Sequence, residues 1–281
     1  MALNICLGNY KGGVGKTKNT VMIAYSLAKM GKKCLVLDLD PQGNATTVLV
    51  RTKQNQETGK VFNFEKTLMG AVQDENLSEV LVNIMPNLSL LPSYIDFANY
   101  STFLDLKFGL VDSKNPNFSS IVDKKIKYLS SLVKPLEEKF DFIFFDVPPT
   151  KSYITDSAVM ASDYVLIVLQ TQELSLDGAT QYLQDLQSLA ETHGGNFEIC
   201  GVLPVLMDGR ASLDKLVLKH AAEVFGKGNI FDLKVPNMSR LKRFDNTGIQ
   251  EKDQFDRKVL GFYKRVTNEF LKRISFFEEA K

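Results

Sequence analysis

Residues 8–19 of the chain read GNYKGGVGKTKN, a glycine-rich stretch with a lysine and a threonine near its end. A short apolar run precedes it at residues 3–7, and a helical pattern of apolar side chains follows at residues 21–28. This order of strand, glycine loop and helix is the setting that a phosphate-binding loop requires. The glycines let backbone N–H groups approach a phosphate, and the helix N-terminus behind them adds donors and a favourable dipole. The sequence therefore predicts a loop that binds a nucleotide.

Two lysines characterise this loop. Lys16 is placed to reach the terminal phosphates, and the Thr17 hydroxyl is placed to ligate Mg²⁺. A strict phosphate-binding motif would have glycine at position 10, where this chain has Tyr10, and Lys11 is an additional cation. A glycine turn without a ligand is the alternative, but the flanking strand and helix patterns favour the nucleotide loop. We expect the phosphates to contact Lys11, Gly12, Gly13, Val14, Gly15, Lys16, Thr17 and Lys18.

Three aspartates follow two further apolar runs. Asp38 and Asp40 end the run at residues 33–38 in the sequence DLDPQGN, and Asp146 ends the run at residues 141–146 before VPP. In open α/β sheets the carboxyl ends of parallel strands form the ligand-binding edge. A carboxylate there can orient a water molecule or hold a metal ion through water. A simple Asx turn would also explain the first pair of aspartates.

Together the motifs KGGVGKT, DLDPQGN and DVPP resemble those of the ParA/MinD family of ATPases, which carry a deviant Walker A loop, and the second motif favours the ParA type. The resemblance implies ATP hydrolysis with Lys11, Lys16 and Asp40 as catalytic residues. In relatives the first lysine reaches the partner's nucleotide across a dimer interface, and the aspartate orients the attacking water. The resemblance also implies a Mg²⁺ site formed by Thr17, Asp38 and Asp146.

Two further positions are interpreted through the same resemblance. The segments around Asp208 and Pro236 resemble segments that close over the adenine in relatives, so both residues are candidate adenine contacts. Such turns also occur without a ligand. Position 18 usually carries threonine or serine in relatives, and here it is Lys18. The lysine replaces a hydroxyl that would help to hold the α-phosphate. It can reach a phosphate as a charge or point outward.

Length and patterning predict the fold class. The 281 residues include 44% hydrophobic and 24% charged residues, which is ordinary for a globular protein. Strand-like runs alternate with helical patterns and no linker divides them, so we expect one α/β domain over residues 1–281 with a doubly wound, mostly parallel sheet and helices on both faces. No N-terminal helix-turn-helix domain is expected. The main strand-like runs are residues 3–7, 33–38, 87–92, 141–146, 164–169 and 198–206. Residues 94–108 have a helical period that places Ile95, Ala98, Phe103 and Leu106 on the buried side, and a further short helix is expected at residues 77–83.

The formal net charge is only +1, but the C-terminal quarter of the chain is basic. In the family that the motifs resemble, cations of this region bind double-stranded DNA without sequence preference in the ATP-bound homodimer. Phosphate contacts need charge and reach rather than a base-reading motif. The first candidates for DNA contacts are Arg240, Lys242 and Arg243, and the second are Lys215 and Lys219 on the preceding helix.

The resemblance implies a partition ATPase of the cytoplasm and nucleoid that uses ATP and Mg²⁺ and is stimulated by a centromere-binding, ParB-type partner. The three cysteines lie in apolar runs and predict buried thiols, and no export leader or membrane-spanning run is visible. One alternative is a MinD-like membrane-cycling ATPase, because apolar residues recur on one face of the basic final helix, although docking of that face on the sheet is the favoured interpretation. A metabolic enzyme on the same fold is the other alternative.

Overall fold

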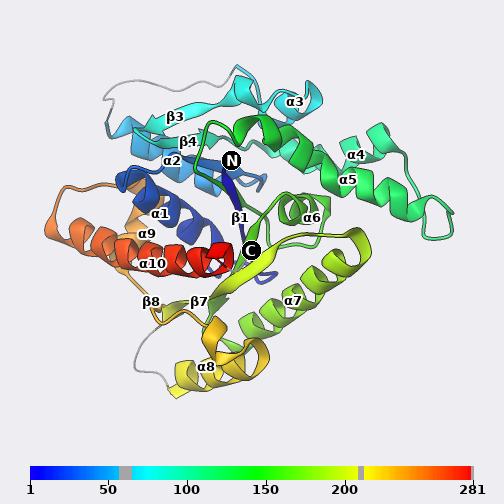
Figure 1. Cartoon of the computed structure of the whole chain (residues 1–281). Helices are drawn as coiled ribbons and strands as arrows, with labels where there is room; N and C mark the ends of the chain where they lie inside the picture. The colour runs from blue at the N-terminus through cyan, green and yellow to red at the C-terminus, as the bar shows by residue number, and fades with distance from the viewer. Residues whose placement is uncertain (57–64, 208–211, 280–281) are drawn as a thin grey trace.

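The computed structural model describes residues 1–56, 65–207 and 212–279 of the chain. Within these residues an eight-stranded sheet has the strand order β3-β4-β2-β5-β1-β6-β7-β8, and it runs through the middle of the molecule in Figure 1. The strands are β1 (Leu3–Gly8), β2 (Cys34–Asp38), β3 (Val82–Met85), β4 (Leu88–Leu91), β5 (Phe142–Asp146), β6 (Tyr164–Gln170), β7 (Glu198–Met207) and β8 (Val235–Pro236).

Parallel pairing dominates this sheet. Among the strands that the structure describes, only the β3–β4 pair at one edge is antiparallel, and the remaining strand pairs are parallel. The central strands β2 and β5 are buried at every residue. Continuous runs of Val, Leu, Ile and Phe are typical of strands that are covered on both faces. The predicted mostly parallel α/β sheet is confirmed.

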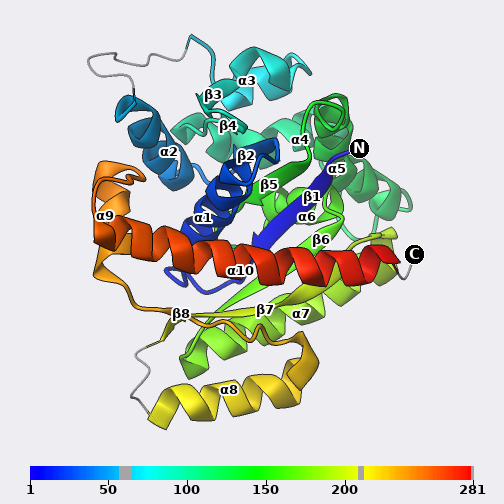
Figure 2. The same ribbon diagram turned by 60° about the vertical axis from the view of Figure 1, so that its left-hand side comes forward.

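Helices cover both faces of the sheet, as Figures 1 and 2 show. Alternate residues of β1 enter different cores: Ile5 and Leu7 join the core under α1, α2, α9 and α10, and Cys6 joins the core on the opposite face. The α-helices are α1 (Lys16–Lys29), α2 (Asn44–Gln54), α3 (Leu68–Gln73), α4 (Tyr100–Phe108), α5 (Phe118–Val133), α6 (Tyr153–Met160), α7 (Glu173–His193), α8 (Ser212–Phe225), α9 (Ser239–Thr247) and α10 (Gln254–Glu279). The 3₁₀ helices are η1 (Leu77–Val80), η2 (Ile95–Asn99), η3 (Lys134–Leu136) and η4 (Lys227–Asn229).

Two local predictions were wrong. A helical period at residues 94–108 predicted that Ile95 and Leu106 are buried, but their side chains are 69% and 83% exposed. The segment consists of η2 followed by α4, and the change from 3.0 to 3.6 residues per turn moves the buried face to Phe97 and Leu104. The second error lies at residues 77–83, where η1 leads directly into the edge strand β3 instead of continuing as a helix.

The final helix α10 packs its apolar face on the sheet, as the sequence predicted. Its residues Val259, Val266, Phe270 and Ile274 are buried among residues of α1 and the neighbouring strands, and α10 lies along the sheet in Figure 2. Tyr263 is fully buried and donates a hydrogen bond from its hydroxyl to the Asn19 side chain of α1, at 3.0 Å. In the ranges that the structure describes, no helix has both the length and the apolar character needed to cross a bilayer.

Candidate phosphate-binding site

The loop between β1 and α1 depends on glycine at two positions. Gly13 has a φ of 76° and Gly15, the N-cap of α1, has a φ of 90°. A Cβ atom at Gly13 would meet no neighbour within 4 Å, so conformation rather than space requires glycine there. Both residues line the cavity described below. The backbone is therefore bent in the way that the sequence motif predicted.

Lys16 is the first residue of α1, and its side chain folds back into the loop. The ammonium donates hydrogen bonds to the carbonyl oxygens of Asn9, at 2.9 Å, and Lys11, at 3.4 Å. Burial lowers the pKa of Lys16, while the charges of Asp146 and Asp40 act in the opposite direction. A buried ammonium held by loop carbonyls has three donors that an anion entering the loop can take over.

The helix α7 holds the first half of the loop, which the sequence did not reveal. The Asn9 amide donates to the carbonyl oxygens of Val168, at 2.8 Å, and Ser175, at 3.2 Å. Its Oδ1 accepts the backbone N–H of Lys11 at 2.8 Å. A Cβ atom at Gly178 of α7 would lie 2.9 Å from that Oδ1 and 3.2 Å from the same backbone nitrogen. Asn9 and Gly178 therefore fix the backbone from which the Lys11 side chain extends.

Tyr10, which stands where a strict motif has glycine, packs against the same helix. Its ring lies 5.1 Å from the ring of Tyr182 in an edge-to-face arrangement. Burial raises the pKa of the Tyr10 hydroxyl, and its hydrogen bond to the Asp185 carboxylate adds to the increase. The tyrosine thus attaches the loop to α7 and leaves the phosphate side of the loop free.

The carboxyl ends of β2 and β5 bring two aspartates side by side. Asp38 and Asp146 are paired in register and both are fully buried. Neither carboxylate oxygen of Asp146 has a hydrogen-bond partner among the described residues. Burial and the neighbouring Asp38 raise the pKa of Asp146 well above its ordinary value, while Thr17 and Lys16 act in the opposite direction. A buried, unpartnered carboxylate beside a threonine hydroxyl fits a hard cation such as Mg²⁺.

The carboxylate of Asp38, unlike that of Asp146, accepts several hydrogen bonds. Its Oδ2 accepts hydrogen bonds from the Thr46 backbone N–H and hydroxyl, both at 2.7 Å, and its Oδ1 accepts the Asp40 backbone N–H at 3.2 Å. Burial raises the pKa of Asp38 to about 6. The side chain therefore fixes the first turn of α2 and the backbone of Asp40, and its predicted contact with a metal stays a prediction.

Asp40 lies at the rim of a cavity of about 650 Å³. Its side chain is 9% exposed, and its Oδ1 accepts the Gln42 backbone N–H at 3.0 Å. The cavity brings together many of the residues that the motifs predicted and adds a wall from α2 and α9. It is lined by Gly13, Gly15, Lys16, Thr17, Lys18, Val21, Met22, Asp40, Gln42, Asn44, Thr47, Val48, Arg51, Val147, Pro149, Leu241, Phe244, Asp245 and Asn246.

Of the two predicted adenine contacts, the structure describes Pro236 alone. Pro236 lies in the two-residue edge strand β8, paired with Met207, and it does not line the cavity. Asp208 lies outside the described residues. Both adenine contacts stay predictions. Of the loop residues, Val14 is buried in the core under α1, and Lys11 and Gly12 are exposed at the surface.

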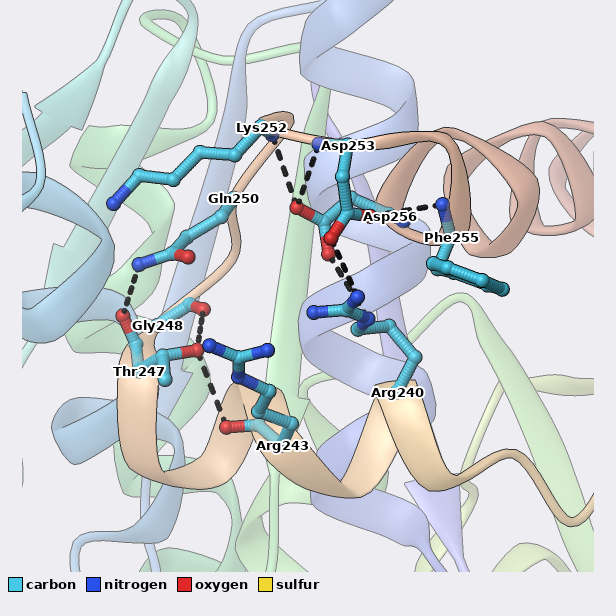
Figure 3. Close-up of polar contacts among 9 residues, drawn as sticks. All are labelled: Arg240, Arg243, Thr247, Gly248, Gln250, Lys252, Asp253, Phe255 and Asp256. Atoms are coloured by element: carbon cyan, nitrogen blue, oxygen red, sulfur yellow. Dashed lines mark hydrogen bonds and ion pairs between the residues drawn. The ribbon is translucent and has the colours of Figure 1, made fainter.

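The candidate DNA-binding residues differ in how their charges are paired. Arg240 of α9 lies 2.5 Å from Asp253 and 3.4 Å from Asp256, where the chain enters α10, as Figure 3 shows. The guanidinium therefore has an internal role, although the sequence placed it first among the DNA contacts. Lys242 and Arg243 are exposed and have no ion-pair partner within the described parts of the chain.

The second pair of candidates lies on α8. Lys215 and Lys219 are exposed, and Lys219 lies 3.9 Å from Glu223 one turn further along the same helix. Figures 1 and 2 show α8 apart from α9. The structure thus presents two separate sets of cations, and it does not join them in one patch.

Comparison with known proteins agrees with this geometry. The AAA_31 family model, described as an AAA domain, matches residues 2–199. The chromosome partitioning protein ParA of Myxococcus xanthus is 29% identical over 245 residues, which cover 87% of this chain and 78% of that protein.

Solved structures share the fold at lower sequence identity. The apo structure of McdA from Cyanothece superimposes with a TM-score of 0.79 and 20% identity, covering 98% of this chain and 100% of that chain. Cobyrinic acid a,c-diamide synthase of Mycobacterium smegmatis, solved with an ATP analogue and magnesium, gives a TM-score of 0.73 at 22% identity, with 97% and 95% coverage. The chain belongs to the AAA_31 family of AAA domains, and the resemblance to ParA-type partition ATPases is confirmed.

Proposed function

We propose that the protein is a partition ATPase that works as a switch: with ATP and Mg²⁺ bound it forms a homodimer that binds DNA without sequence preference, and hydrolysis releases the DNA. The observation that carries this proposal is the arrangement of the loop: the buried Lys16 ammonium is held by the loop carbonyls of Asn9 and Lys11, and the carboxylate of Asp146 is buried without a hydrogen-bond partner among the described residues. A relative named as a chromosome partitioning protein supports the biological setting.

Phosphoryl transfer to water needs positioned groups and neutralised charge. Lys16 would exchange its loop carbonyls for phosphate oxygens, and Asp40 would orient the attacking water at the cavity rim. Lys11 is exposed, and within the described ranges its ammonium has no ion-pair partner. Its side chain is therefore available to a nucleotide bound by a second copy of the chain, which is the role proposed for it.

Mg²⁺ would be held by Thr17 and Asp146, with Asp38 fixing the adjacent backbone. The cation would neutralise charge on the phosphates that the loop binds. The unpartnered oxygens of Asp146 are the feature of this chain that fits it. The proposed nucleotide contacts along the loop are Lys11, Gly12, Gly13, Val14, Gly15, Lys16, Thr17 and Lys18, and those to the adenine are Asp208 and Pro236.

DNA would bind to exposed cations, because contacts with phosphate need charge and reach. Lys242 and Arg243 on α9 are the stronger candidates, since they are exposed and have no ion-pair partner among the residues that the structure describes. Lys215 and Lys219 on α8 are the second set. A centromere-binding, ParB-type protein is the proposed stimulating partner, and the nucleoid is the proposed location.

The test compares binding of a fluorescent 40-base-pair duplex of arbitrary sequence with ATP, with ADP and without nucleotide, each with Mg²⁺. We expect binding only with ATP, together with a doubling of the mass measured by light scattering. Lys16→Ala should abolish both changes while the protein stays folded. Binding to DNA that is equal in all three nucleotide states would refute the switch.

A metabolic ligase is the second candidate, because the cobyrinic acid a,c-diamide synthase structure has the same fold. That candidate predicts no DNA binding in any nucleotide state and ATP turnover that depends on a small acceptor. The docked apolar face of α10 argues against the membrane-cycling alternative, since Phe270 and Ile274 are buried in the core.

A further inference from the structure

An ion pair joins the phosphate-binding loop to α9 across the cavity. Lys18 is the third residue of α1, and its Nζ lies 2.8 Å from Oδ2 of Asp245 in α9. The two side chains are 21% and 50% exposed, and both residues line the cavity that also contains Lys16 and Thr17. The ion pair therefore stands at the boundary between the phosphate end of the cavity and its α9 wall.

The backbone of Asp245 is fixed independently of this ion pair. The Arg51 side chain of α2 donates a hydrogen bond to the Asp245 carbonyl oxygen. The adjacent turn is attached to α2 as well, because the Ile249 N–H donates to the Thr52 hydroxyl at 2.8 Å. Phe244, the residue before Asp245, is buried. The carboxylate is thus presented to Lys18 from a rigid support, and its removal need not displace α9.

Once a nucleotide is bound, two anions can pair with the Lys18 ammonium: the Asp245 carboxylate and a phosphate of the nucleotide. Lys18 follows directly after the phosphate loop, and its flexible stem can turn toward a phosphate. When it does so, Asp245 is left unpaired at the edge of a site that holds several negative charges. The Asp245 carboxylate and the phosphates are both negative and repel each other. This repulsion is screened less at a partly buried site than in bulk water.

We propose that Asp245 competes with the nucleotide phosphates for the Lys18 ammonium and thereby lowers the affinity of the site for ATP and ADP. The inference rests on the proposed nucleotide binding. It assigns a role to the lysine at position 18, next to the motif hydroxyl of Thr17: Lys18 binds phosphate only after it has been released by a carboxylate of the same chain. Asp245 is a tuning residue of the site and does not itself contact the phosphates.

A double-mutant cycle on Lys18 and Asp245, read by isothermal titration calorimetry with ATP and with ADP, tests this competition. Asp245→Asn keeps the shape of the side chain and should tighten both nucleotides about fivefold, because the cost of breaking an exposed ion pair disappears. Lys18→Met should weaken both nucleotides by about the same factor, since a phosphate contact is lost. If the ion pair had only a structural role, both variants would change the affinity for nucleotide in the same direction.

The double variant separates competition from simple repulsion. Competition requires Lys18, so Asp245→Asn should tighten ATP clearly less in the Lys18→Met background than in the parent. A gain that is equal or larger in that background would overturn the proposal. Adenosine, which lacks phosphates, should bind the parent and Asp245→Asn equally. A tighter affinity for adenosine in the variant would also overturn it.

A matched control removes an ion pair of similar length elsewhere. Lys107 and Glu75 lie 2.7 Å apart and do not line the cavity. Glu75→Gln should leave the Kd for ATP unchanged. If the parent itself binds no ATP, the proposed function fails and the competition fails with it. If the parent binds ATP and Asp245→Asn leaves the Kd at the parent value, only the competition fails.

Discussion

Two buried aspartates of this protein, Asp146 at the end of β5 and Asp256 at the start of α10, are 0% and 1% exposed. Asp256 lies against Arg240, at 3.4 Å, and accepts the backbone N–H of Lys252 at 2.9 Å. Asp146 has no hydrogen-bond partner among the described residues. One buried carboxylate is therefore paired with an arginine and a backbone donor, whereas the other has only the nearby charge of Lys16 and no hydrogen bond among the described residues.

Burying a charge without a partner costs free energy, whereas a partnered buried charge can hold two elements together. The unpartnered Asp146 lies at the ligand-binding edge of the sheet, next to Lys16 and Thr17. The partnered Asp256 lies in the first turn of α10, where Arg240 of α9 contacts it. The comparison is consistent with the ligand role proposed for Asp146, and the Arg240 pairs connect α9 to the start of α10.

The largest expected effect follows from replacing Asp146 with asparagine. We expect ATP hydrolysis to fall by at least about a hundredfold, since a proposed Mg²⁺ ligand is lost. The empty protein should nevertheless become more stable, because the variant removes a buried charge. Steady-state phosphate release and thermal unfolding without nucleotide measure the two effects.

The gain in stability should depend on pH in a defined direction. Burial raises the pKa of Asp146, so the unfolded chain releases this proton at a lower pH than the folded protein does, and the free energy of unfolding falls as pH rises from the ordinary aspartate pKa to the raised one. Asp146→Asn should therefore stabilise the empty protein more at pH 8 than at pH 5. A variant that is less stable than the parent at pH 8 would show that the carboxylate has a partner that supports the fold.

An intermediate effect is expected from Lys242 and Arg243, the exposed cations of α9 without an ion-pair partner in the described ranges. The double variant Lys242→Ala/Arg243→Ala should weaken DNA binding in the ATP state about tenfold on any sequence, because two phosphate contacts are lost. The slope of log K against log salt should fall by about two. Lys215→Ala/Lys219→Ala on α8 is the matched comparison, and a larger loss there would move the DNA-binding surface to α8.

The sequence predicted the site where its residues are close along the chain or share a strand end. The spacing of Lys16 and Thr17 after the glycines is local, and the aspartates at the ends of β2 and β5 meet because parallel strands share an edge. The support of the loop was not predictable, because Asn9 contacts Ser175, 166 residues away, and no local pattern marks it. The Lys18–Asp245 ion pair was not predictable for the same reason, because its two residues are 227 positions apart in the sequence.

Surface charge is the weakest part of such predictions, since the sequence gives the number of cations but not their partners. Arg240 and Lys242 are two residues apart and equally basic in the sequence. In the structure the first is 19% exposed and paired with two carboxylates, and the second is exposed. The two-residue strand β8 was missed for a related reason, because its pairing with β7 depends on tertiary contacts and not on a local apolar run.

The smallest effect on DNA is expected from Arg240→Ala, and it tests the comparison directly. Removing the guanidinium leaves Asp256 buried without its cation, so the free energy of unfolding should fall by about 3 kcal/mol. Affinity for DNA should change by less than about twofold, because the charge of Arg240 is already neutralised by Asp253 and Asp256. As a comparison, Lys219→Ala breaks the exposed ion pair with Glu223, one helical turn away. It should lower the free energy of unfolding by less than about 0.5 kcal/mol. A loss of DNA affinity in Arg240→Ala as large as that of the α9 double variant, with stability unchanged, would mean that Arg240 leaves its carboxylates to contact DNA.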